Sequence, residues 1–338
     1  MGQKTMENAL NAIRNEASDF YKSRVPVATR DNLAQVGAAV LSYTAVTNEF
    51  LLTAINRIGL AWVRNKELRN PLAVLKQGSI DLGTDIEEIG VNPAKARTYN
   101  PTSASLLTQT PPDVKTIYYR MNRQDMYPIT VSRQRMKGAF VSWRTLESLF
   151  EAIMQSMYNG NYVDEFALTK ALFADAIANS RIVTRTTAAV TDETSAKTLI
   201  KSMRNVYTDM QMPSSSFNTY SRMTGATGDP YITRTEASDI RVIIRSDIEA
   251  ITDVDVLASA FNMSKADFLG RKLVVDNFGT ATNCLAILMD RSYTQIWENL
   301  MEVTEFANGE NLSWNYYLHV WQTWGVSPLA NAVAFVTA

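Results

Sequence analysis

The C-terminal end of this chain carries no charged side chain. Residues 311–338 contain no Asp, Glu, Lys or Arg, although charged residues make up 20% of the sequence, and they include three of its six tryptophans. From 312 to 320, apolar and aromatic residues occupy every second position, with Trp314, Tyr316 and Leu318 on one face. This alternation is typical of a strand with one buried face. The sequence therefore predicts a strand that must be covered, either by the core of its own chain or by a neighbouring chain.

The chain is long enough to bury a large core. Its 338 residues are 46% hydrophobic, which allows more than one compact lobe. Thirty-three basic and 34 acidic side chains leave a formal charge of −1, whereas proteins that mainly bind nucleic acid usually have a basic excess. A net charge near zero also removes long-range repulsion between copies. Composition thus fits a self-associating subunit and an ordinary cytosolic protein alike.

The sequence predicts a protein that is made and used in a cytoplasm. Cys284 is the single cysteine, so no intrachain disulfide can form, and its apolar neighbours in 284–290 predict a small buried hydrophobic residue. The first 16 residues lack the apolar core of a secretory signal. The charge-free C-terminal segment is interrupted by Asn, Gln, His and Pro, which argues against a membrane span there. We expect no membrane partner.

Several segments have patterns typical of one kind of secondary structure. Residues 5–20 have the apolar spacing of a short amphipathic helix, and 143–157 that of a longer helix, which Asn159–Gly160 should interrupt. Residues 181–198, rich in Thr and Ser, predict a loop. Strand-like apolar runs, which together predict a compact mixed lobe, lie at 240–244, 272–276 and 284–290.

Residues 62–100 have a different pattern. The segment 62–76 is polar on both faces, the acidic segment 79–89 follows it, and Gln77–Gly78 between them has turn chemistry. The pattern predicts a long two-stranded hairpin. Such a hairpin is only marginally stable by itself in water, so we expect it to lie on another surface.

The chain offers few residues for catalysis. His319 is the only histidine, which excludes a two-histidine metal site and the HExxH motif. A nucleophile–base pair of Cys284 and His319 is disfavoured, because both lie in apolar strand-like segments. The sequence contains no phosphate-binding loop of the Walker A or GxGxxG type. We therefore predict no metal site and no cofactor.

Two pairs of acidic residues are poor candidates for acid–base catalysis. Glu87 and Glu88 are adjacent, so on a strand they point to opposite faces. Asp253 and Asp255 directly precede an apolar helical pattern, where acidic side chains stabilise the helix N-terminus. We predict no catalytic residue.

Four blocks of the sequence resemble one protein family, in the same order. They are 56–72 (NRIGLAWVRNKELRNPL) with 82–89 (LGTDIEEI), 140–149 (FVSWRTLESL), 254–270 (VDVLASAFNMSKADFLG) with 272–276 (KLVVD), and 314–335 (WNYYLHVWQTWGVSPLANAVAF). This set is similar to the core of the major capsid protein of phi-29-like podoviruses, which are tailed bacteriophages. The similarity extends from about residue 10 to residue 336.

The resemblance implies an α+β fold, the HK-97-like major capsid fold, in which each E-loop lies over a neighbouring subunit. The implied parts are an N-terminal arm (1–60), an extended E-loop hairpin (61–100), a peripheral domain with its spine helix and connecting loops (101–235), an axial domain (236–300) and a return strand that completes the peripheral domain (301–338). Because the chain ends just after NAVAFVTA, the resemblance also implies that it lacks the C-terminal immunoglobulin-like domain of the type member.

The same resemblance implies a function in assembly, without enzymatic activity. Copies would self-assemble into pentamers and hexamers of an icosahedral shell that encloses viral double-stranded DNA. The implied partners are the chain itself, a scaffolding protein, a portal protein and, through non-specific contacts, the packaged DNA. The implied location is the virion, after assembly in the host cytoplasm. An encapsulin-type cellular shell is an alternative with the same fold, and a carboxylate-dependent enzyme is the alternative from another class.

Opposite charges gather in two separate segments. Residues 114–144 contain seven basic side chains and one acidic one, whereas 77–94 contain four acidic and no basic side chains. The segments could be solvated faces, complementary surfaces on different subunits or, for the basic one, a surface that contacts DNA phosphates. The inter-subunit interpretation, which includes the tip of the predicted hairpin, selects Lys76, Gln77, Gly78, Asp81, Asp85, Glu87, Glu88, Arg133, Arg135 and Lys137.

Overall fold

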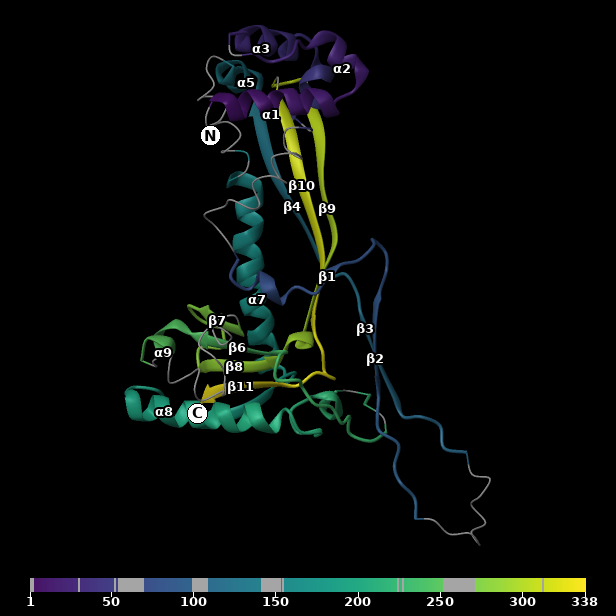
Figure 1. Cartoon of the computed structure of the whole chain (residues 1–338), viewed down its shortest axis with the longest axis vertical. Coiled ribbons are helices and arrows are strands. Elements are labelled where there is room, and N and C mark those ends of the chain that lie inside the picture. The colour runs from purple at the N-terminus through teal and green to yellow at the C-terminus, as the bar shows by residue number, and fades with distance from the viewer. Residues whose placement is uncertain are drawn as a thin grey trace. The chain divides into compact units, whose positions relative to one another are not determined.

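The chain divides into two compact units and passes between them several times (Figure 1). The first unit consists of Met1–Asn70, Arg123–Glu165 and Glu298–Gln322. The second unit consists of Pro71–Asn122, Phe166–Trp297 and Thr323–Ala338. The structure, a computed structural model, describes residues 3–29, 31–51, 53, 70–98, 109–140, 153, 155–223, 225–226, 228–251, 271–311 and 313–338.

Short helices form one part of the first unit. They are α1 (Gln3–Glu16), α2 (Asp19–Arg24), α3 (Leu33–Ser42) and α5 (Arg133–Ala139). The helix predicted at 5–20 is divided in two, because Ser18 caps the start of α2 by accepting a hydrogen bond from the amide of Tyr21. Its apolar stripe is confirmed at Leu10, Ile13 and Ala17, which are buried, but not at Phe20, which is 45% exposed.

An antiparallel sheet forms the other part of the first unit. β10 (Ser313–Val326) pairs with β4 (Arg123–Ser132), with Ser313 opposite Ser132 and Gln322 opposite Arg123. β9 (Thr294–Asn308) lies on the other side of β10. The C-terminal strand predicted from the sequence is thus the middle strand of this part of the sheet.

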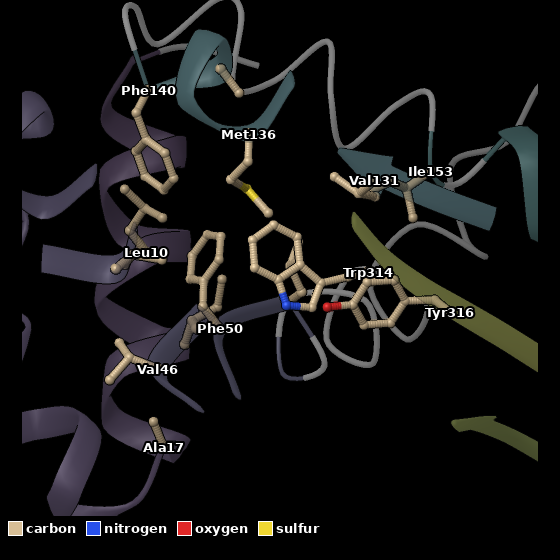
Figure 2. Close-up of a cluster of buried hydrophobic side chains, with 14 of the residues drawn as sticks. Leu10, Ala17, Val46, Phe50, Val131, Met136, Phe140, Ile153, Trp314 and Tyr316 are labelled. Carbon is tan, nitrogen blue, oxygen red and sulfur yellow. The ribbon is translucent and has the colours of Figure 1, made fainter. Parts of the chain in front are cut away.

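The buried face of β10 is covered by its own chain. Trp314 and Tyr316 are 6% and 0% exposed, and they pack in one hydrophobic cluster with side chains of the N-terminal helices and of α5. Figure 2 shows the indole of Trp314 among Phe50, Met136 and Tyr316. The predicted half-buried strand is confirmed, and the cover that the structure shows is the intrachain one.

The second unit is built on a five-stranded sheet. Its order is β5 (Val183–Thr187), β11 (Ala332–Thr337), β8 (Cys284–Asp290), β6 (Ile240–Arg245) and β7 (Lys272–Val275). The two outer pairs are parallel and the two inner pairs are antiparallel. The strands predicted at 240–244, 272–276 and 284–290 are confirmed as β6, β7 and β8. The predicted loop at 181–198 is wrong, because it contains β5 and the start of a helix.

Helices cover both faces of this sheet. α8 (Glu193–Asp209) packs Leu199 and Met203 against one face, and α7 (Gly160–Ala178) packs Phe173 against the other. Cys284 is buried in the second of these clusters, as the sequence predicts. Shorter helical segments are α9 (Ser246–Ile251), η1 (Ala73–Leu75), η4 (Tyr220–Arg222) and η5 (Arg291–Tyr293).

The predicted interruption at Asn159–Gly160 is wrong. A π-helical turn, η3 (Gln155–Asn159), runs directly into α7 at Gly160. Gly160 lies against Tyr127, where a Cβ would come within 3.4 Å of the ring. The small residue therefore allows a close contact and does not end the helix. Most of the predicted helix at 143–157 lies outside the described residues.

The predicted turn at Gln77–Gly78 is also wrong. The backbone amide of Gln77 donates to the carbonyl of Ile296 at 2.9 Å, and β1 (Gly78–Ser79) pairs with β9. β2 (Ile86–Val91) pairs instead with β3 (Val114–Tyr119) in an antiparallel ladder. We call this pair the β2–β3 hairpin. Residues 62–69 of the predicted hairpin lie outside the described residues.

Helices of the membrane-spanning kind are not found in the described part of the chain, where no helix is both long and apolar enough to cross a bilayer. In the same part, no group of three or more His, Cys, Asp or Glu side chains is placed to hold a metal ion.

Candidate inter-subunit surface

The β2–β3 hairpin has one exposed, largely apolar face. Glu87 lies opposite Tyr118 and Val91 opposite Val114, so these four side chains share a face with Ile89. Ile89, Val91, Val114 and Tyr118 are 59%, 54%, 48% and 63% exposed. A contiguous exposed patch of large apolar side chains marks a surface that contacts another molecule. We call these five residues the outer face of the hairpin.

The opposite face of the hairpin is anchored within the second unit. Gly90 lies against Tyr231, where a Cβ would come within 2.8 Å of the ring. The Tyr119 hydroxyl donates to Glu88 Oε2 at 2.6 Å, and the Ser327 hydroxyl donates to Glu88 Oε1 at 2.7 Å. Burial and the nearby Glu88 carboxylate raise the pKa of Tyr119, so its hydroxyl keeps the proton that it donates. Contacts within the second unit therefore hold the outer face in place.

Lys115 is a second anchor of the hairpin. This side chain is 2% exposed, and its ammonium group lies 2.6 Å from Asp113 and 5.0 Å from the centroid of the Tyr220 ring. Asn92 donates to the same carboxylate at 2.8 Å and accepts from the amide of Ile232 at 2.9 Å. The hydrogen bonds from Lys115 and Asn92 hold the pKa of Asp113 below its usual value. Lys115 is thus a buried structural cation, and its inclusion in a basic surface segment is wrong.

Three of the four acidic residues predicted at the interface have partners in their own chain. Asp85 lies 2.8 Å from the Arg120 guanidinium, and Glu87 accepts from a tyrosine hydroxyl of β3 at 2.9 Å. Glu88 is held by the two hydroxyl groups described above. Asp81 is exposed and forms no ion pair with any described residue. One pair of opposite charges from the two segments, Asp85 and Arg120, therefore meets within one chain, beside the paired strands β2 and β3.

Gln77 and Gly78 belong to a strand junction of the second unit. The Gln77 side chain donates to the carbonyls of Arg291 and Thr294 at 2.7 and 2.8 Å. Gly78 pairs with β9, and the half-buried Lys76 precedes both residues. These positions are held within the subunit and do not form a loop tip, so their predicted contact with a neighbour stays a prediction.

The three basic residues predicted at the interface lie on the exposed side of α5. Arg133, Arg135 and Lys137 are exposed, whereas Met136 and Ala139 are buried in the hydrophobic cluster of the first unit. None of the three forms an ion pair within the described residues. The acidic residues belong to the second unit and these basic residues to the first. That they meet across a subunit boundary stays a prediction.

A second exposed apolar surface lies on the sheet of the first unit. On the face of β10 away from the hydrophobic cluster, His319 stands opposite Met126 of β4. Met126 is 51% exposed, and Phe306 of β9 is 63% exposed. His319 Nε2 lies 2.9 Å from the Thr304 hydroxyl, so the single histidine bridges two neighbouring strands. This second surface, around Met126, Phe306 and His319, is not evident from the sequence, because its members come from three separate segments.

The residues considered for catalysis are not arranged for it. Cys284 is fully buried, and burial raises the pKa of its thiol to about 12, which opposes formation of a reactive thiolate. Glu87 and Glu88 point to opposite sides of β2, as predicted: Glu87 is exposed, and Glu88 points to the anchored face. Asp253 and Asp255 lie outside the described residues.

Comparisons of the sequence with known proteins agree on one family. The family model described as Phi29-like phage major capsid protein matches residues 10–336. The chain is 39% identical to the major capsid protein of Bacillus phage PZA over 331 residues, which are 97% of this chain and 72% of that protein. It is 36% identical to the major capsid protein of Bacillus phage B103 over 340 residues, which are 100% of this chain and 74% of that protein.

Solved structures show the same fold. A chain from the capsid structure of Staphylococcus phage Andhra has a TM-score of 0.67 and 15% identity, with 81% of this chain and 86% of that chain covered. A chain from a structure of native bacteriophage P68 has a TM-score of 0.64 and 13% identity, with 80% and 85% covered. The HK-97-like fold predicted from the sequence is thus confirmed, and the family match favours a phage shell over the encapsulin-type alternative. The chain belongs to the Phi29-like phage major capsid proteins, and it is a structural component of a phage shell and so of the virion.

Proposed function

We propose that copies of this chain assemble into the pentamers and hexamers of an icosahedral shell, with each β2–β3 hairpin lying over a neighbouring subunit. The outer face of the hairpin supports this proposal, because Ile89, Val91, Val114 and Tyr118 are apolar, exposed and carried on a fixed support. Covering such a face removes apolar surface from water and stabilises the contact. Each subunit would offer the same hairpin to the next one, and such heterologous contacts can close into rings.

The exposed sheet surface of the first unit is our candidate for the receiving side. Met126 and Phe306 there are 51% and 63% exposed, which matches the apolar character of the outer face. A single contact of this kind need not be strong. Each subunit would be held by several neighbours at once, and linked contacts add to far more than any one of them.

The proposal includes further partners of the shell. A scaffolding protein guides assembly in the host cytoplasm, a portal protein occupies one vertex, and the shell encloses double-stranded DNA. The formal charge of −1 supports only weak, non-specific contacts with that DNA, because phosphate binding requires a local excess of Lys and Arg. The role is structural and involves no catalytic step.

Polar substitutions on the outer face test this proposal. Ile89→Thr with Val91→Thr should change the melting temperature of the dissociated subunit by no more than about 2 °C, since both side chains are more than half exposed. The same variant should lower the yield of shells at least about fivefold, because part of the contact loses its apolar area. Sedimentation and electron microscopy of the particle fraction measure the yield.

Val163→Thr is the matched control, because Val163 is 55% exposed on α7 and lies outside the hairpin. It should assemble like the unmodified chain. Normal shell yield from the hairpin variant would show that the outer face is not an assembly contact. Failure of the unmodified chain to form shells under any condition would contradict the proposed function itself.

A further inference from the structure

A hollow of about 540 Å³ lies in the second unit, where the ends of β3, α7 and β10 meet η4. Tyr118 of the outer face lies at its edge, but the hollow itself has no role in the contact proposed above. Its lining combines three arginines with aromatic and apolar side chains: Arg120, Arg181, Arg222, Tyr118, Met223 and Trp324.

Hydrogen bonds hold the walls of this hollow in place. The Asn122 side chain donates to the carbonyl of Trp324 and accepts from its amide, both at 2.8 Å. The Arg181 carbonyl accepts from the hydroxyls of Tyr293 at 3.0 Å and Thr219 at 3.2 Å. A site that is already formed spends little binding free energy on ordering its own residues. The hollow is therefore suited to receive a ligand without rearrangement.

Two of the three arginines already bind carboxylates at the rim. The Arg120 guanidinium lies 2.8 Å from Asp85, and that of Arg181 lies 3.2 Å from Asp175. Arg222 is exposed and has no acidic partner among the described residues. A guanidinium binds carboxylate or phosphate through paired hydrogen bonds. The hollow thus contains one cation that is available for an incoming anion.

The lining favours a carboxylate on a peptide over the phosphates of a nucleic acid. The carboxylates of Asp85 and Asp175 reduce the positive charge around the hollow and would repel a chain of phosphates. Tyr118 and Met223 are 63% and 39% exposed, so an apolar side chain beside the incoming carboxylate would cover them. A phosphate contact alone would leave this apolar surface in water.

We infer that the hollow binds an acidic segment of a second copy of this chain, with Arg222 paired to the incoming carboxylate. The chain carries the matching chemistry, because 292–338 contains four glutamates and no lysine or arginine. Glu302 and Phe306 of β9 lie on the same face of the strand, where Glu302 is exposed and Phe306 is 63% exposed. The acidic segment of one copy and Arg222 of another copy therefore carry complementary charges. The inference rests on the proposed function, since it assigns one more contact to the same shell.

A zero-length cross-link tests this assignment. Arg222→Lys keeps the positive charge and supplies an amine that a carbodiimide couples to a carboxylate in direct contact. Shells are assembled from equal amounts of ordinary and isotope-labelled variant, treated with carbodiimide, digested and analysed by mass spectrometry. We expect residue 222 to couple to an Asp or Glu of another copy, recognised by its mixed isotope label, and this product to be absent from dissociated subunits. The control is Arg204→Lys, an exposed residue of α8 outside the hollow, which should give no such product.

Several results would overturn the inference. Residue 222 could couple to its own chain or to another protein, or it could fail to couple in intact shells. Alternatively, the amine at residue 222 could become reactive only after nuclease digestion, which would indicate that nucleic acid occupies the hollow. If the variant does not assemble, phenylglyoxal labelling of unmodified shells decides: Arg222 should be protected in shells and modified in dissociated subunits, and equal labelling would count against the inference. Shells that form without the intermolecular coupling contradict only this inference, whereas absence of shells contradicts the proposed function.

Discussion

Tyr119 and Tyr316 are both buried, but their hydroxyl groups have different surroundings. The Tyr119 hydroxyl donates to Glu88 at 2.6 Å, whereas that of Tyr316 has no hydrogen-bond partner among the described residues. Tyr119→Phe should destabilise the subunit by about 1–3 kcal/mol, because the half-buried Glu88 carboxylate loses a donor. Tyr316→Phe should be neutral or stabilising, because it removes an unpaired polar atom. Urea unfolding of dissociated subunits measures both, and equal losses for the two variants would contradict this reading.

The buried thiol of Cys284 should make stability depend on alkaline pH. Burial raises its pKa from 9.0 to about 12, so between these values the unfolded thiol ionises while the folded one stays protonated. The resulting contribution to stability is complete below about pH 9 and declines as the pH rises towards 12. At pH 8, a thiol-specific disulfide reagent should react with unfolded chains only. Rapid labelling of the native subunit at that pH would show that the thiol is accessible.

At the scale of elements, Arg123 joins two strands and a helix of the first unit. Its guanidinium lies 2.5 Å from Gln322 of β10 and 3.1 Å from Asn161 of α7. Gln322 in turn donates to Glu165 at 2.7 Å. All four side chains are at most 7% exposed. The network therefore fixes the register of β4 against β10 and holds both strands to the start of α7.

Arg123→Met should destabilise the subunit by about 3–5 kcal/mol, because a buried carboxylate loses its nearby cation. Arg135→Met, on the exposed side of α5, should change stability by no more than about 0.5 kcal/mol. Denaturant unfolding at constant pH compares the two. A loss for Arg123→Met no larger than that for Arg135→Met would mean that the network is not a structural element.

Charge reversal on α5 tests the predicted electrostatic interface. Arg133→Glu with Arg135→Glu should slow shell assembly, and adding Asp81→Lys should partly restore the rate. Asp81 is the suitable acidic partner, because Asp85, Glu87 and Glu88 are engaged within their own chain. Exposed pairs contribute about 0–1 kcal/mol each, so the effect should appear in the rate and its salt dependence. Light scattering measures the rate, with Arg204→Glu as the control. If Asp81→Lys does not restore the rate, Asp81 does not face Arg133 and Arg135 across a subunit boundary.

The sequence predicts some elements well, for physical reasons that the structure makes plain. β10 alternates because one face is buried, whereas β8 and residues 242–244 of β6 are continuous apolar runs because both their faces are covered. β5 is missed because its sequence, VTRTT, has no apolar alternation; backbone hydrogen bonds to β11 hold it in place. The hairpin is misplaced because Gln77–Gly78 has turn chemistry, whereas the true partner of β2 begins at Val114.

At the scale of the whole molecule, the candidate surface is only partly visible in the sequence. Acidic and basic residues do gather in separate segments of the sequence, but pairing of β2 with β3 places Asp85 beside Arg120 in the same chain. The exposed apolar faces depend on strand register and on which side the core covers, and neither can be read from local patterns. Four ordered blocks that span both units predict the family and the fold, because such a resemblance does not depend on placing each strand correctly.

Cryo-electron microscopy of assembled shells can show directly whether the β2–β3 hairpin is a contact between subunits. We expect an icosahedral shell of pentamers and hexamers in which the hairpin of each subunit lies on a neighbour. Ile89 and Tyr118, 59% and 63% exposed in the single subunit, should be covered by that neighbour. Shells in which this face of the hairpin remains open to solvent, or folds back onto its own subunit, would contradict the account.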